Sequence, residues 1–145
     1  MNRADYEIIV FSDDWAGLPI SSKHLLKHFL PDIPVMWVEM IGLRAPKINV
    51  YDIKRSIDKL YGWVKAKPNG MNQIANLHII DPVQLPYYQS SLIRACNKRL
   101  VLRTIERLSR SMPKRKRVVF TTLPFSGDLI GCLDEDVSIY YRADD

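Results

Sequence analysis

The sequence predicts an α/β fold of the Rossmann-like, doubly wound kind: one domain whose mostly parallel five-stranded sheet carries helices on both faces. Short β-branched and aromatic runs alternate along the chain with stretches of helical periodicity. The strand runs are continuously apolar rather than alternating, which is typical of parallel strands buried on both faces. The length of 145 residues also suits a single domain, so residues 1–145 are expected to fold as one unit.

The first three elements are predicted as a strand, a helix and a strand. Residues 6–12 (YEIIVFS) form an uninterrupted β-branched and aromatic run. A serine cap at Ser21 or Ser22 begins a helix that extends to residue 30, where prolines end it. Residues 34–39 (PVMWVE) then give the second strand.

The middle of the chain predicts two helices around one strand. Residues 50–64 carry apolar side chains every three or four positions, as an amphipathic helix does. Residues 77–81 (LHIID) form the third strand, which Pro82 closes. Residues 88–111 are the longest helix candidate, and Pro113 ends it.

The last three elements complete the order β-α-β-α-β-α-β-α-β. Residues 117–123 and 137–143 are strands, and residues 127–133 are a short helix between them. Right-handed crossovers favour the sheet order 3-2-1-4-5, in which the first and fourth strands are neighbours. The loops that follow these two strands then diverge and open a crevice at the carboxyl edge, the edge formed by the carboxyl ends of the parallel strands.

Two loops at this edge are rich in polar residues. Residues 12–22 (SDDWAGLPISS) and 121–128 (TTLPFSGD) both contain Ser, Gly and Pro, and both lead into helix N-termini. Free N–H groups at a helix N-terminus favour anionic or hydroxyl-rich ligands. These two polar loops therefore lie where this architecture binds ligands.

The acidic pair Asp13 and Asp14 has two interpretations, a ligand or base pair and ordinary turn carboxylates, and both stay open. Together with Asp81 and a threonine at the end of the fourth strand, the pair also resembles a phospho-accepting receiver. That class needs a lysine after the fifth strand, where this chain reads YYRADD. The receiver class is therefore disfavoured.

The histidines and tryptophans also have a plain and a functional interpretation. His24 and His28 are four residues apart, a spacing that can hold a metal, but no third ligand accompanies them. We expect an exposed helix face there, no metal and no cofactor. Trp15 and Trp37 are either platforms for sugar rings or packing beside a core strand.

The positive charge is concentrated in one part of the chain. The formal net charge is +5, yet residues 94–117 hold ten Lys/Arg against one Asp/Glu. A basic stripe on the long helix consists of Arg99, Arg103, Arg107 and Arg110. The plain interpretation is a solvated face on which Glu106 bridges Arg103 and Arg110. The functional one is attraction to anionic lipid or a phosphorylated acceptor rather than to nucleic acid, because no aromatic residues or recognition motif accompany the charge.

Composition bounds the class of protein. The chain is 47% hydrophobic and 26% charged, which is typical of a globular protein. No apolar run approaches the roughly 18 residues that a membrane span needs, and the start MNRADYE lacks a signal core. Cys96 and Cys132 are far apart and lack metal-binding spacing, which suits a reducing compartment. We expect a cytoplasmic protein, either free or peripheral at the inner face of the membrane.

Six stretches in order resemble the N-terminal half of bacterial GT-B glycosyltransferases, and more narrowly the retaining, polysaccharide-assembling group. They are DDWAGLPISSKHLLKHFL, VMWVEMIGLRAPKI, DIKRSIDKL, LPYYQSSLIRACNKRLVLRTIERL, TTLPFSG and VSIYYRADD. The resemblance covers nearly the whole chain. It implies the acceptor side of a two-domain enzyme whose C-terminal half binds the nucleotide sugar. That half is absent from this sequence, so the chain alone is expected to be inactive.

The resemblance also implies site residues but no catalytic one. The acceptor-binding residues by matching position are Asp14, Trp15, Ser21, Ser22, His24, Arg44, Arg94 and Asn97. The cleft-shaping residues are Gly17, Pro19, Thr122, Pro124 and Asp144. In this assignment the two acceptor-binding arginines hold anionic groups of a glycan or lipid-linked acceptor, and Asp14 and Ser22 bind its hydroxyls. The first loop departs from many relatives in lacking a Gly-Gly run, which puts a close phosphate approach in doubt.

A different class of function stays open beside this one. A stand-alone flavodoxin-like binding or scaffold domain would use the basic helix to dock on a membrane or an acidic partner. Vesicle binding and its salt dependence would separate docking from a purely structural helix.

Overall fold

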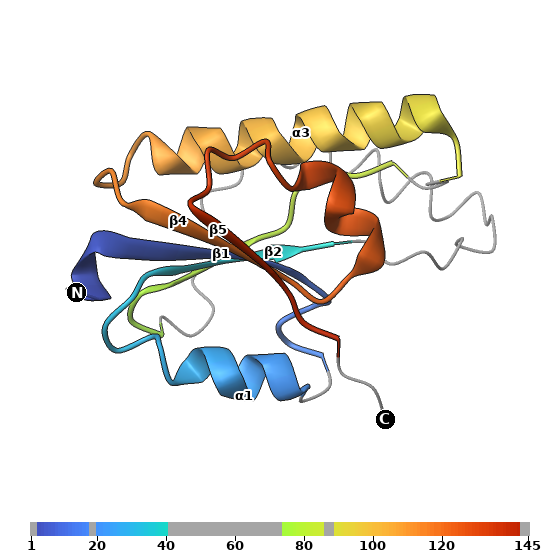
Figure 1. Cartoon of the computed structure of the whole chain (residues 1–145). Helices are drawn as coiled ribbons and strands as arrows, with labels where there is room; N and C mark the ends of the chain where they lie inside the picture. Colours follow the sequence, from blue (N-terminus) through green and yellow to red (C-terminus); the bar gives the residue numbers. More distant parts are fainter. Residues whose placement is uncertain (1–2, 18–19, 41–73, 86–88, 143–145) are drawn as a thin grey trace.

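The computed structural model describes residues 3–17, 20–40, 74–85 and 89–142, which form a parallel sheet between helices (Figure 1). A short 3-10 helix, η1 (Arg3–Asp5), precedes the sheet. The strands are β1 (Tyr6–Ser12), β2 (Val35–Glu39), β3 (Leu77–Ile80), β4 (Lys116–Thr121) and β5 (Val137–Tyr140). Every pairing is parallel and the order is β3-β2-β1-β4-β5. The predicted fold class and strand order are confirmed.

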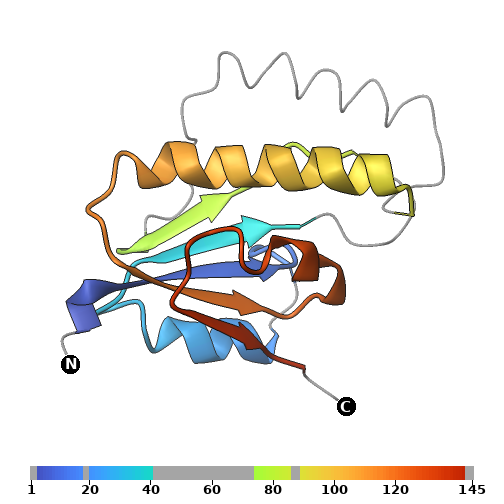
Figure 2. The ribbon, with the colours of Figure 1, turned by 45° about the horizontal axis from the view of Figure 1, so that its top comes forward.

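Helices lie on both faces of the sheet. Helix α1 (Ser21–Lys27) covers one face, and α3 (Ser91–Ser109) runs along the strands on the other (Figure 2). The short 3-10 helix η2 (Pro124–Leu129) follows β4. The helix predicted over residues 50–64 lies outside the described residues.

Three details of the helix prediction are wrong. The first helix ends at Lys27 rather than at residue 30, and Ile20 occupies its N-cap position without a side-chain cap. Both serines therefore belong to the first helical turn. The predicted helix over 127–133 is instead η2, which starts earlier because Pro124 has the φ angle that a first helical position requires.

Two hydrophobic cores occupy the two faces of the sheet, because successive side chains of a strand point to opposite faces. On the α3 face, Ile9 and Phe11 of β1 pack in the same buried cluster as Val101 and Ile105 of α3. On the α1 face, Ile8, Val10, Trp37 and Phe120 pack with Leu26 and Leu30. Burying each large apolar side chain contributes about 1.5–3 kcal/mol. This explains why the central strands are apolar without alternation.

Strand β5 departs from that expectation. All four of its residues are exposed, including Ile139 and Tyr140, and β5 forms an edge of the sheet. Just beyond it, Tyr141 stacks on Phe120 with ring centroids 5.7 Å apart.

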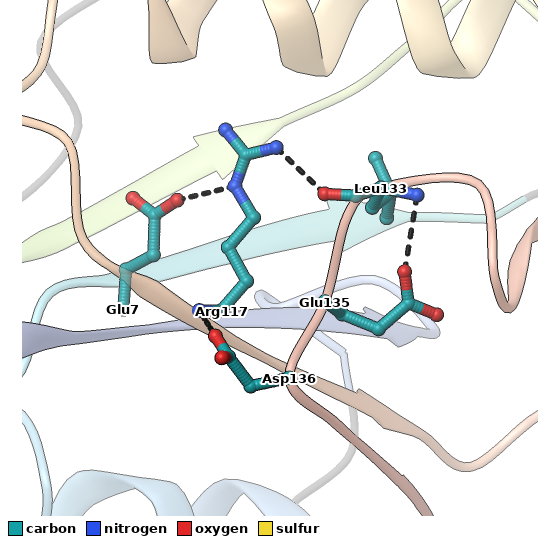
Figure 3. Close-up of polar contacts among 5 residues, drawn as sticks. All are labelled: Glu7, Arg117, Leu133, Glu135 and Asp136. Carbon is teal, nitrogen blue, oxygen red and sulfur yellow. Dashed lines mark hydrogen bonds and ion pairs between the residues drawn. The ribbon is translucent and has the colours of Figure 1, made fainter.

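A partly buried ion pair joins β1 to β4 near the amino ends of the strands (Figure 3). Arg117 Nε donates to Glu7 Oε1 over 2.7 Å, and Arg117 Nη1 donates to the Leu133 carbonyl over 2.8 Å. The backbone N–H of Arg117 also donates to Asp136 Oδ2. This one arginine thereby fixes β1, β4 and the loop before β5 relative to one another.

The same loop is organised by Glu135, whose carboxylate accepts hydrogen bonds from the backbone of Gly131 and Leu133 and from the Ser138 hydroxyl. Burial raises the pKa of Glu135, but these hydrogen bonds and one from its own backbone outweigh burial, so the pKa lies below its usual value. The ionised form therefore holds the turn that leads into β5.

Candidate functional site at the carboxyl edge

The ends of β1 and β4 lie side by side at the carboxyl edge. Phe11 is opposite Thr121 in the register, and the Thr122 N–H donates to the Phe11 carbonyl. The hydroxyls of Ser12 and Thr122 hydrogen-bond over 3.0 Å, which links the starts of the two loops. The prediction that the first and fourth strands leave the sheet next to each other is confirmed.

Beyond this link, the two loops part toward opposite faces of the sheet. Trp15 packs against the α1-side cluster, whereas Phe125 and Leu129 pack with the α3-side cluster. The β4 loop is braced at its start, where Thr121 and Ser126 hydrogen-bond through their hydroxyls. The carboxyl edge is thus bordered by the β1 loop on the α1 side of the sheet and by the β4 loop on the α3 side.

The loop after β1 is a tight turn with a polar outer side. The Asp14 carboxylate accepts the Ala16 N–H over 2.8 Å, which is the local bond of an Asx turn. Gly17 closes the turn by donating its N–H to the Asp14 carbonyl, and a Cβ at position 17 would lie 3.2 Å from that carbonyl oxygen. Gly17 therefore shapes the turn of this loop, and Asp14 is exposed on it.

The two tryptophans have different environments. Trp37 is completely buried, and its Nε1 donates to the Asp13 carbonyl over 2.9 Å. Trp15 packs edge-on against it, with centroids 4.9 Å apart, and the Lys27 ammonium lies 6.0 Å from the Trp15 centroid. Trp37 is thus a core residue that anchors the loop. Trp15 is half-buried and remains partly accessible at the edge.

Glu39 is a site residue that the sequence analysis missed. It ends β2, and its Oε1 accepts the Trp15 N–H over 2.9 Å. Burial raises the pKa of Glu39, and the negative charges of Asp14 and Asp81 and a hydrogen bond with Asp14 raise it further, against the lowering effect of the Trp15 N–H. Three carboxyl groups from the ends of β1, β2 and β3 therefore interact. The predicted strand order contained the signal, because it places the end of the second strand beside the first loop.

Replacing Glu39 by glutamine is expected to change the pH dependence of stability. The glutamine oxygen still accepts the Trp15 N–H, but the group no longer titrates. Because the folded-state pKa lies above the usual 4.5, the stability from this carboxyl is fully present below that value and is lost as pH rises through the raised pKa. Urea denaturation at several pH values should show the variant gaining stability relative to the wild type across this window. A difference that is constant with pH would contradict the expectation.

The predicted residues around α1 differ in accessibility. Ser21 and His24 are exposed at the start of the helix, whereas Ser22 is buried and its hydroxyl has no hydrogen-bond partner. Lys23 is also buried and donates to the Gly17 carbonyl over 3.1 Å, which ties the helix to the first loop. The structure therefore places Ser21 and His24, but not Ser22, where a ligand can reach them.

On the α3 side, Arg94 reaches the edge and Asn97 does not. Arg94 Nε lies 3.8 Å from Asp128 Oδ2 of η2, and both side chains are about half exposed. The buried Asn97 amide instead accepts the Leu85 N–H and donates to the Leu85 carbonyl, so it anchors the chain that precedes α3. Its placement supports a structural role.

The last predicted site residues and the two hollows near the sheet remain to be placed. Pro124 is exposed at the start of η2, while Pro19, Arg44 and Asp144 lie outside the described residues. The hollow beside Arg94 and Asp128 measures about 10 Å³, which is room for about one water molecule. A larger open depression of about 640 Å³ lies instead near the start of β4, around Lys114 and Asp134. The carboxyl edge is the better candidate because open α/β sheets bind ligands there.

Within the described ranges, no group of three His, Cys, Asp or Glu residues could hold a metal ion. The same ranges contain no helix with the length and apolarity that crossing a bilayer requires. The bridge of Glu106 to Arg103 and Arg110, which belongs to the plain interpretation of the basic stripe, is not formed among these residues.

The fold and this edge define a doubly wound α/β domain with carboxylates, a partly exposed tryptophan and an arginine at the carboxyl ends of its strands. A scan against protein-family models and searches of curated proteins and solved structures found no match to the chain.

Proposed function

We propose that this chain is the acceptor-side domain of a GT-B-type glycosyltransferase and that its carboxyl edge binds a glycan or lipid-linked acceptor. The observation that carries the proposal is the adjacency of β1 and β4, whose loops part toward opposite faces, with Asp14 exposed and Trp15 partly exposed on the β1 loop. Carboxylates accept hydrogen bonds from sugar hydroxyls, and an indole provides an apolar surface for a sugar ring.

The side chains at the edge would have separate tasks in this function. Asp14 would accept hydrogen bonds from acceptor hydroxyls, and the partly exposed ring of Trp15 would orient a sugar. Arg94, whose ion pair with Asp128 is long and solvent-exposed, would exchange that partner for an anionic group of the acceptor. Such a domain contributes by positioning the acceptor against a donor held by a second domain, so it needs no general base of its own.

The proposal is tested by glycan binding rather than by turnover, because transfer needs the donor domain. The wild-type chain would be titrated with acidic and neutral oligosaccharides and followed by saturation-transfer NMR. Asp14→Asn should weaken binding by about 10- to 100-fold, the range expected for a lost charge-assisted hydrogen bond. Trp15→Ala should remove the saturation transfer from the protein to the ring protons of the bound sugar.

Asp134→Asn is the matched control, because Asp134 is an exposed aspartate in the loop before β5 with a positive φ of 54° that asparagine tolerates. It should leave glycan binding unchanged. Equal losses in both asparagine variants, or no binding of any glycan by the wild type, would overturn the proposal.

A stand-alone binding or scaffold domain is the second candidate function. The absence of an ion pair between Glu106 and its arginine neighbours within the described residues favours it, because the basic stripe is then available to a partner. This second function would be favoured if the chain binds a membrane or an acidic partner but binds no glycan.

A further inference from the structure

The outward face of α3, the side opposite the buried Val101 and Ile105, presents the basic stripe to solvent. Its arginines are all exposed and are Arg99, Arg103, Arg107 and Arg110. At about 100° per residue these four positions span only about 80° of the helix circumference, and Leu92 falls within the same arc. Leu92 is 77% exposed, the highest exposure of any large apolar side chain among the described residues.

Interactions within the described part of the chain do not neutralise this charge. The guanidinium groups of the stripe form no ion pair there, and Glu106 is the one acidic residue of α3. Exposed Lys114 adds a further positive charge just beyond the end of the helix. Like charges four residues apart repel one another and destabilise a helix, so an external anionic surface would relieve a repulsion that the fold leaves in place.

We propose that the outward face of α3 docks on an anionic lipid bilayer. The stripe would contact the headgroups while Leu92 enters the interface beside them. A helix of 19 residues is about 28 Å long and presents its charges in a straight row, which fits a flat surface. A lipid surface suits this face better than nucleic acid, because α3 contains no aromatic residue on which a base could stack.

Docking in this manner also orients the carboxyl edge. The Leu92 end of α3 is the end at which Arg94 meets Asp128 of η2, so it adjoins the edge framed by the two loops. With α3 flat on the bilayer, the part of that edge around Arg94 and η2 would lie nearest the headgroups, and Asp14 and Trp15 would lie farther away, on the α1 side of the sheet. A lipid-linked acceptor would then extend from the bilayer past Arg94 toward them. This orientation rests on the proposed function, whereas the docking does not.

Sedimentation with vesicles tests the docking. The full chain would be mixed with vesicles of phosphatidylglycerol and phosphatidylcholine, or of phosphatidylcholine alone. The double variant Arg103→Glu/Arg107→Glu should lower the partition coefficient for anionic vesicles by at least about 25-fold, at roughly fivefold for each basic residue lost. The matched control Lys27→Glu/Lys116→Glu changes the net charge equally but alters exposed residues on the α1 side of the sheet, so its loss should be much smaller.

A second measurement tests the position of the bilayer. Cys96 is exposed and lies in the same arc of α3, so a Cys132→Ser variant can carry an environment-sensitive fluorophore at Cys96 alone. Its emission should rise with anionic vesicles and not with neutral ones, and Leu92→Ser should reduce the rise.

Three outcomes would overturn the docking proposal: no binding to anionic vesicles at low salt, equal losses in the two double variants, or displacement of the protein from vesicles by a small excess of RNA. Vesicle binding without glycan binding would instead leave the docking intact and remove the proposed function.

Discussion

Replacing Arg117 by alanine is expected to lower the free energy of unfolding by about 3–5 kcal/mol, measured by urea denaturation. The substitution removes the partner of Glu7, whose side chain is only 3% exposed, and leaves its carboxylate buried without a counter-charge. It also removes the donor to the Leu133 carbonyl. The start of β1, the start of β4 and the loop before β5 would lose their common connection.

The double variant Glu7→Leu/Arg117→Met is the control for this prediction. It removes both charges and keeps apolar volume, so no charge remains buried and the loss should be much smaller than for Arg117→Ala. Equal losses in the single and double variants would show that packing, rather than the uncompensated carboxylate, determines the cost.

Replacing Trp37 by alanine is the second change with a large expected effect, a loss of about 3–5 kcal/mol in the free energy of unfolding. Trp37 is fully buried in the α1-side cluster, so the substitution leaves a cavity. The loop also loses the hydrogen bond from Nε1 to the Asp13 carbonyl, and Trp15 loses the ring on which it packs. Stability and glycan binding should therefore both decline.

Trp37→Phe separates the two contributions. Phenylalanine retains much of the volume but cannot donate to Asp13, so its cost should be about 1–2 kcal/mol. Trp15→Ala, at a half-buried position, should cost less than Trp37→Ala. An unfolding free energy that falls as much for Trp15→Ala as for Trp37→Ala would contradict the assignment of Trp37 to the core and Trp15 to the edge.

Contacts of the candidate site that form within one loop were predictable from the sequence, whereas contacts between residues of different strands were not. Asp14 and Gly17 belong to one loop whose turn chemistry is local, because the Asp14 side chain accepts the Ala16 N–H and the Gly17 N–H donates to the Asp14 carbonyl. Glu39 joins that loop from 24 residues away, so its contribution depends on the neighbouring strand. The partnership of Glu7 and Arg117 spans 110 residues and has no local signal.

Local patterns alone determined the strands, the parallel sheet and its order, because uninterrupted apolar runs separated by crossover lengths of chain leave few topologies. Tertiary packing decided which side of an element each polar residue occupies. It buried Ser22 and Asn97, left Trp15 and Arg94 accessible, and left the side chains of β5 exposed. A repeating pattern of side chains specifies an element and its apolar face, whereas the environment of a particular side chain depends on what the rest of the chain brings against it.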